Sequence, residues 1–167
     1  MARVAKAIYS AVAVAATLAG LSAAADPTDA DVERAVAAAV NRHREERGLE
    51  PLGWSDAAAE LARQHSGDMA AGRVGFGHDG FEQRERILRS EAGASRIAEN
   101  VAHQSAKTPS VSDASVAGWI ASPAHRRNLE GPYQLAGVGA SRGADGSVYL
   151  TEIFFGTAPA PRAPMTP

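Results

Sequence analysis

The hydrophobic pattern changes its period in the last third of the chain, and this change limits the possible folds more than any other feature. Apolar spacing and capping residues predict helices over 28–48, 55–72, 81–90, 110–121 and 123–128. Segments 135–141 and 148–155 have the pattern of strands, joined by a glycine-containing hairpin signal at 142–146, and 98–103 is a shorter strand candidate. Helices followed by mainly antiparallel strands predict an α+β domain with helices packed on a small sheet.

Alanine limits the core that such a domain can build. Hydrophobic residues make up 45% of the 167 residues, but 37 of them are alanine and only 5% of the chain is aromatic. The bulky part of the core must therefore come from a limited set of Leu, Val, Ile, Phe and Trp residues. The length fits one domain, or one domain with a tail.

Cysteine content and net charge exclude several classes of function. The chain has no cysteine, which rules out a disulfide scaffold, a thiolate metal site, a cysteine nucleophile and a lipoprotein anchor. A formal net charge of −2 gives no electrostatic case for nucleic acid as a partner. No phosphate loop or dinucleotide fingerprint occurs either. We therefore expect no nucleic-acid partner. We also expect a monomer.

The first 25 residues have the pattern of an export signal. Arg3 and Lys6 precede an apolar run over 7–21, and Ala23-x-Ala25 supplies the small residues that a signal peptidase needs. A membrane anchor is the alternative, but the run is short for a span of about 20 residues. We predict a signal peptide at 1–25, one domain at 26–156 and a disordered Pro/Ala-rich tail at 157–167. The mature protein is then secreted, extracellular or periplasmic, with no membrane segment.

Three polar residues carry the candidate chemistry. His78 lies in the glycine-rich loop Gly77-His78-Asp79-Gly80, and His125 follows the predicted helix that contains Trp119. Glu99 lies inside an otherwise apolar strand, where a carboxylate is costly to bury unless it is paired or hydrogen-bonded. Two histidines and a carboxylate can bind a divalent metal with open positions for water. They can also form a hydrogen-bonded polar centre, and the spacing alone does not show that they converge.

The other three histidines have simpler explanations. His43 lies among charged residues at the end of the first helix and is predicted to be solvated. His65 shares a helix stripe with Leu61 and Met69, so we predict a buried, hydrogen-bonded side chain. His103 follows the predicted strand and is expected to face solvent or the rim of a cleft.

Several short motifs occur in one order between residues 40 and 155. They are Ala62-x-x-His65-Ser66, Phe76-Gly77-His78-Asp79, Ala98-Glu99-Asn100-Val101, Trp119-x-x-Ser122-Pro123-x-His125-Arg126-x-Asn128, Gly137-Val138-Gly139 and Tyr149-x-Thr151-Glu152-x-Phe154. Together they resemble the CAP superfamily, which groups cysteine-rich secretory proteins, insect antigen 5, plant pathogenesis-related proteins and bacterial SCP-like proteins. The resemblance implies a three-layer α-β-α sandwich, and the cysteine-free form is bacterial in style.

The resemblance also implies a central cleft with two histidines and two glutamates, where some family members bind zinc or another divalent ion. His78, Glu99 and His125 match three of these positions. Ser122 occupies the place of the fourth ligand, and Glu152 replaces a glutamine that is common in the last strand. We expect these five residues in the cleft, with His78, Glu99 and His125 as ligands of a weakly bound divalent metal such as zinc.

Three further residues match family positions. Trp119 is predicted to belong to the core, because it lies on one helix face with Val116 and Ile120. Arg84 and Asn128 are predicted to brace loops around the cleft through hydrogen bonds to backbone carbonyls.

Functions of three classes fit this sequence. We prefer a non-enzymatic secreted module that binds a small ligand, such as a lipid, a peptide or an envelope component. The alternative is a metal-dependent hydrolase of peptides or cell-wall material, in which Glu99 is a metal ligand or a general base. The third class is a structural envelope protein whose polar centre only stabilises the fold. A serine hydrolase built from Ser122, His125 and Glu99 is disfavoured, because no nucleophile elbow surrounds the serine.

Overall fold

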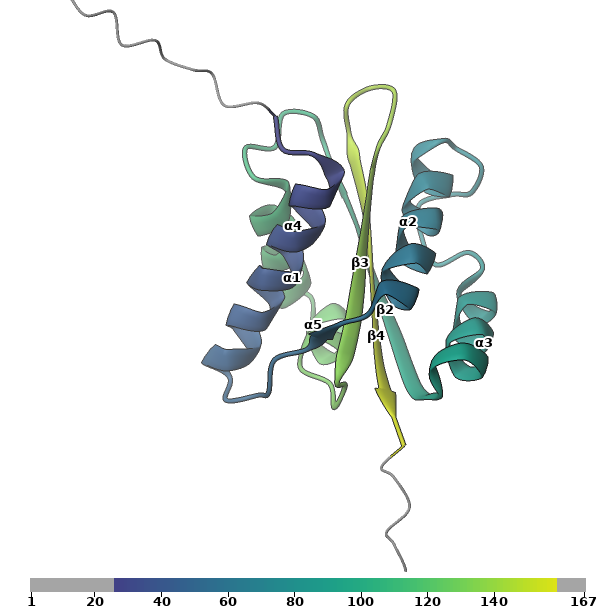
Figure 1. Cartoon of the computed structure of the whole chain (residues 1–167). Helices are drawn as coiled ribbons and strands as arrows, with labels where there is room; N and C mark the ends of the chain where they lie inside the picture. The colour runs from purple at the N-terminus through teal and green to yellow at the C-terminus, as the bar shows by residue number, and fades with distance from the viewer. Residues whose placement is uncertain (1–25, 159–167) are drawn as a thin grey trace, which may run out of the picture.

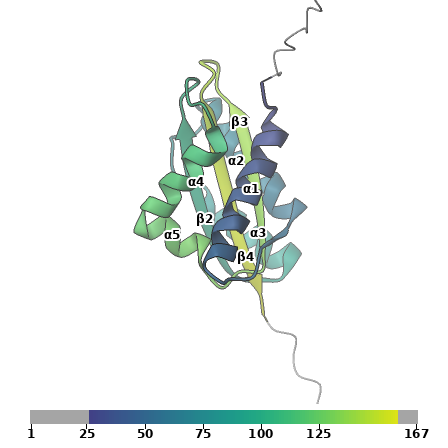
Figure 2. The ribbon, with the colours of Figure 1, turned by 90° about the vertical axis from the view of Figure 1, so that its left-hand side faces the viewer.

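A four-stranded sheet separates two layers of helices in the computed structural model, which describes residues 26–158 (Figure 1). Helices α1 (Asp29–Glu46), α4 (Val111–Ala121) and α5 (Pro123–Leu129) cover one face of the sheet. Helices α2 (Asp56–Ala70) and α3 (Phe81–Ala92) cover the other. The turned view shows the first group lying over the strands (Figure 2). The predicted α+β fold, an α-β-α sandwich, is confirmed.

The sheet is mainly antiparallel, as predicted. Its strands are β1 (Gly53–Trp54), β2 (Ala94–Gln104), β3 (Leu135–Arg142) and β4 (Val148–Thr157), in the order β1-β3-β4-β2. Strand β4 pairs antiparallel with both β2 and β3, whereas β1 pairs parallel with β3. The sequence does not predict β1, because two paired residues are too few to show a strand period.

Side-chain caps begin α1, α2 and α4 at the predicted places. Thr28 and Asp31 form a capping box at the start of α1, in which each side chain accepts a hydrogen bond from the other residue's backbone N–H. Ser55 and Ser110 each accept one backbone hydrogen bond at the starts of α2 and α4. These caps make the helix starts readable from the sequence.

Glycines in β3 let α2 lie directly on the sheet. A Cβ atom built at Gly137 would overlap the backbone of Ala59, and one built at Gly139 would overlap the backbone of Arg63. The helix turns its small residues Ala58 and Ala62 to this contact, and both are fully buried. The alanine-rich composition therefore builds a core by close approach rather than by large side chains.

Side chains from α4 and α5 cap the free edge of β2. The Trp119 indole donates to the Val101 carbonyl at 2.9 Å, and the Asn128 amide donates to the Glu99 carbonyl at 3.3 Å. These bonds satisfy edge groups that no neighbouring strand pairs. Trp119 is 2% exposed, which confirms its predicted place in the core. The carbonyl bond predicted for Asn128 is present as well.

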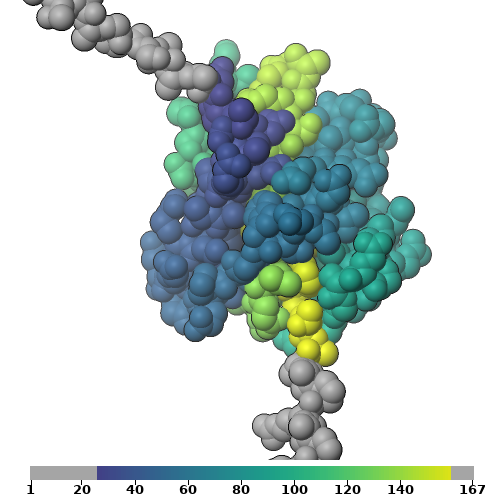
Figure 3. All heavy atoms as spheres, viewed as in Figure 1, coloured from purple at the N-terminus to yellow at the C-terminus, as the bar shows by residue number. Residues whose placement is uncertain are grey.

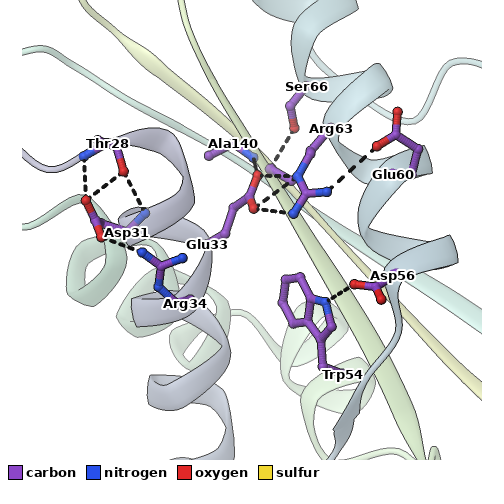
Figure 4. A network of polar contacts seen from close by, with 11 residues as sticks. Thr28, Asp31, Glu33, Arg34, Trp54, Asp56, Glu60, Arg63, Ser66 and Ala140 are labelled. Atoms are coloured by element: carbon purple, nitrogen blue, oxygen red, sulfur yellow. Dashed lines mark hydrogen bonds and ion pairs between the residues drawn. The ribbon is translucent and has the colours of Figure 1, made fainter.

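The opposite edge of the sheet is capped from α1. Glu33 accepts a hydrogen bond from the Ala140 N–H at 3.2 Å. Arg63 of α2 reaches the same carboxylate, with Nη2 2.8 Å from Oε2 (Figure 4). Helices from both layers thus meet around the edge of β3.

The sequence prediction for His43 was wrong. Its side chain is buried at the end of α1, and its Nε2 lies 3.0 Å from Glu130 Oε1. The adjacent Arg44 donates to the carbonyls of Leu129 and Gly131. The charged residues around His43 suggested solvent, but the segment after α5 folds back over this end of the helix.

The predicted signal peptide at 1–25 and residues 159–167 of the predicted tail lie outside the described residues. Thr157 was expected to begin the tail, but it pairs with Ala94 and ends β4. Among the helices within residues 26–158, none combines the length and the apolar character needed to cross a membrane.

Candidate functional site

Glu99 is held by an arginine from the neighbouring helix. Its side chain is 1% exposed. Arg84 of α3 donates from Nε to Oε2 at 2.7 Å and from Nη2 to Oε1 at 2.8 Å. The third donor of Arg84, Nη1, bonds the Asp79 carbonyl at 2.8 Å, as predicted for a brace of this loop. A two-point charged pair of this kind satisfies a buried carboxylate.

His78 is oriented by the same carboxylate. Its Nδ1 lies 2.9 Å from Glu99 Oε1. A carboxylate oxygen accepts hydrogen bonds, so His78 Nδ1–H is the donor in this contact. The His78 side chain is 49% exposed. Its second nitrogen, Nε2, is therefore the atom left for a ligand.

The glycine-rich loop brings His78 over the sheet. Gly80 has a φ of +76° directly before α3, a left-handed conformation that glycine adopts without strain. His65 of α2 is buried and its Nε2 lies 2.8 Å from the Gly77 carbonyl. This confirms the predicted buried, hydrogen-bonded role of His65, and it ties the loop to α2.

His125 lies on α5, beside β2. Helix α5 begins with proline and is fixed to β2 by Asn100, which donates to the His125 carbonyl at 3.2 Å. Asn128 in turn donates to Asn100 Oδ1 at 2.8 Å. Burial, and to a smaller degree the nearby charge of His78, lower the pKa of His125 from its ordinary value of 6.5. At neutral pH its imidazole is uncharged.

An open hollow of about 400 Å³ adjoins this group. Its wall consists of His78, Phe81, Ile97, Ala98, Glu99 and Asn128. The sequence analysis missed the three apolar members, although Phe81 and Ile97 flank the two motifs that carry His78 and Glu99. The wall offers an apolar surface beside an imidazole, which suits a ligand with an apolar part and a hydrogen-bonding group.

The other two predicted cleft residues lie elsewhere. Ser122 is half-buried at the junction of α4 and α5, where its carbonyl accepts from the Arg126 N–H. Glu152 pairs across the sheet with Asn100, the neighbour of Glu99. Successive strand residues point to opposite faces, so Glu152 faces the α1 layer and not the cleft.

The predicted metal ligands do not form a ready site. Within residues 26–158, no group of three or more His, Cys, Asp or Glu side chains is placed so that it could hold a metal ion. Both oxygens of Glu99 are bonded to Arg84, whose positive charge would lie beside any cation bound there. The described residues thus show no preformed metal-binding group, and zinc binding stays a prediction.

Comparison with models of known protein families shows which family the chain belongs to. The model of the family described as "CAP: Cysteine-rich secretory protein family" matches residues 37–155. The chain belongs to the CAP family. The match contains His78, Glu99, His125 and the α2–β3 contact, and it confirms the resemblance seen in the motifs. A comparison with curated proteins finds no match.

Solved structures of other CAP or surface proteins have the same fold. An extracellular SCP-domain protein from Bacillus anthracis matches with a TM-score of 0.63 and 26% identity, over 77% of this chain and 41% of that protein. An outer surface protein from Borrelia burgdorferi matches with a TM-score of 0.66 and 15% identity, over 78% and 96%. A cysteine-rich secretory protein from Staphylococcus aureus matches with a TM-score of 0.59 and 20% identity, over 77% and 39%. This chain therefore spans less than half of the Bacillus and Staphylococcus proteins.

Proposed function

We propose that this CAP domain is an exported, non-enzymatic binding module whose ligand occupies the hollow beside His78. The observation that carries the proposal is the bond from His78 Nδ1 to Glu99, because it fixes the ring and leaves Nε2 for a ligand. Export rests on the predicted signal at 1–25, and the Bacillus and Borrelia proteins described as extracellular or outer-surface support it.

The wall of the hollow favours a peptide-like envelope component as the ligand. Phe81, Ile97 and Ala98 supply an apolar surface for a short side chain. The neutral form of His78 accepts a hydrogen bond at Nε2, which suits an amide N–H. A long lipid chain fits less well, because the hollow is open and its apolar surface is limited to these three residues.

Hydrolysis of a peptide is the second candidate, favoured by the same His78–Glu99 bond. A carboxylate that orients an imidazole is also the arrangement of a general base. Glu99 itself cannot be that base, since Arg84 occupies both of its oxygens. His78 would have to activate a water molecule. The wall contains no hydroxyl side chain that could act as nucleophile, so binding remains the better-supported function.

An NMR titration with muramyl dipeptide tests the proposal. This probe combines a sugar, an apolar residue and amide groups from the bacterial envelope. We expect saturable shifts of the Phe81, Ile97 and Ala98 amides, lost in His78→Ala and kept in the control His103→Ala, which changes an exposed histidine on the same strand as Glu99. Shifts that persist in His78→Ala would contradict the proposal. Cleavage products that disappear in His78→Ala would favour the hydrolase.

A further inference from the structure

A second cavity lies at the other edge of the sheet, between α1 and the paired strands β1 and β3. Its volume is about 120 Å³, and its wall includes Ala38, Leu52, Trp54, Val138 and Glu152. Trp54 lies at this edge, near the Glu33–Arg63 pair (Figure 4). The space-filling view shows α1 and the start of α2 meeting on this side of the molecule (Figure 3). The cavity is thus separate from the hollow beside His78.

Glu152 is the polar side chain in this wall that lacks a partner. Asn41 donates to the Leu52 carbonyl at 3.0 Å and accepts from the Leu52 N–H at 2.8 Å, so both ends of its amide are used. The Trp54 indole donates to Asp56 at 2.9 Å. Glu152 is 1% exposed, and its Oε2 has no hydrogen-bond partner among residues 26–158. A buried oxygen of this kind is costly unless a ligand or another group meets it.

The charges around Glu152 limit what can meet it. Arg44 is 2% exposed and donates to the carbonyls of Glu50, Leu129 and Gly131. Burial raises the pKa of Glu152 well above its ordinary value, and the charge of Arg44 lowers it by a smaller amount. The raised pKa favours the protonated carboxyl group, which has an O–H to donate. An ammonium ligand would be repelled by Arg44. An anion would lose its hydration without gaining a hydrogen bond from Nε or Nη1 of Arg44, because both are directed to backbone carbonyls.

We propose that this cavity is a second binding site, which takes a small uncharged aliphatic molecule whose hydroxyl or carbonyl oxygen accepts a hydrogen bond from Glu152. The alanine, leucine and valine side chains of the wall contact the alkyl part, and the exposed Trp54 side chain belongs to the same wall. The site does not depend on the function proposed for His78, because the two lie at opposite edges of the sheet.

The volume sets the size of the ligand. An engineered apolar cavity of about 150 Å³ in another protein binds benzene. A cavity of about 120 Å³ therefore suits an alkyl chain of about four carbons with one oxygen. A longer chain would have to extend past Trp54 into solvent.

Three probes that each contain four carbon atoms test the ligand class. Titrations of 1-butanol, butylammonium and butyrate into the ¹⁵N-labelled protein are followed at the Trp54 indole and the Ala38 and Val138 amides. We expect saturable shifts with 1-butanol and affinities lower by about tenfold or more for the two charged probes. Equal responses to all three probes, or shifts that do not saturate with 1-butanol, would overturn the proposal.

Two variants test the contributions of the hydrogen bond and of the apolar wall to binding separately. Glu152→Leu removes the donor while keeping the side-chain volume similar, and Ala38→Leu narrows the cavity from an exposed position on α1. We expect each variant to weaken 1-butanol binding by about tenfold or more. The exposed change Arg34→Ala, four residues before Ala38 on α1 and outside the cavity wall, is the control and should bind as wild type. Binding that survives in Glu152→Leu would overturn the proposal, whatever the result for Ala38→Leu.

Discussion

Arg84 donates two hydrogen bonds to Glu99, from Nε to Oε2 at 2.7 Å and from Nη2 to Oε1 at 2.8 Å. Both side chains are buried between α3 and β2. Removal of one partner of a buried ion pair leaves an uncompensated charge. Arg84→Met should therefore lower the free energy of unfolding by about 3 kcal/mol, measured by urea denaturation.

The matched control for this prediction is Arg86→Met, because Arg86 lies exposed on the same helix. It should change stability by less than about 0.5 kcal/mol. The double variant Arg84→Met/Glu99→Met should regain part of the loss, since it buries no unpaired charge. Equal stability of Arg84→Met and Arg86→Met would show that the pair does not hold Glu99 in solution.

Gly139→Ala should disrupt the contact between α2 and β3. The added Cβ would overlap the backbone of Arg63, which cannot move without shifting the whole helix. Overpacking of this kind should cost about 3 kcal/mol or more. Gly75→Ala is the control, because a Cβ there meets nothing within 4 Å. Thermal unfolding of the two variants, side by side, gives the comparison, and similar melting temperatures would refute the close packing.

Glu152 should make the protein less stable as the pH rises. Its folded pKa lies well above the ordinary value of 4.5, so above that pH the unfolded chain loses a proton that the folded chain keeps. The contribution of the protonated Glu152 side chain to folding stability is fully present below about pH 4.5, and it is lost as the pH rises through the folded pKa. In Glu152→Gln this dependence disappears. The stability difference between variant and wild type should thus grow in favour of the variant, by at most about 1.4 kcal/mol per pH unit.

Urea unfolding of wild type and Glu152→Gln at several pH values between 4 and 8 measures their stability difference. The other titrating groups are the same in both proteins, so their effects cancel in this difference. A stability difference that stays constant over this range would mean that Glu152 is ionised in the folded protein. The neutral hydrogen-bond donor required by the second site would then be absent.

The pKa of His125 should depend on the charge of His78. Burial is the larger cause of its lowered pKa, and the charge of His78 is the smaller one. In His78→Ala the His125 pKa should rise but stay below 6.5, because its burial remains. A ¹⁵N NMR titration of the two proteins gives both values. An unchanged pKa would place the two imidazoles too far apart to share a ligand.

The sequence predicted the local structure well, because the signals for helices lie next to one another in the chain. Thr28 and Asp31 cap α1 within four residues, and the hairpin of β3 and β4 surrounds its own turn signal. The short β1 was not predictable, since its existence depends only on pairing with β3.

The candidate site was predictable only in part. His78, Glu99 and His125 carry chemistry that a sequence motif shows, and the structure bonds His78 to Glu99. The Arg84–Glu99 pair joins residues 15 positions apart on a helix and a strand, a contact that no local pattern indicates. Glu152 was assigned to the wrong face, because the side of a strand residue follows from register, which is set by pairing with distant strands.

The most direct test of the proposed ligand site is the ¹⁵N chemical shift of the two His78 ring nitrogens during titration with muramyl dipeptide. The proposed site predicts that Nε2 moves with the saturation of binding, while Nδ1 keeps the shift of a protonated nitrogen bonded to Glu99. Saturable binding that leaves the His78 Nε2 resonance unchanged would contradict the proposal and place the ligand elsewhere.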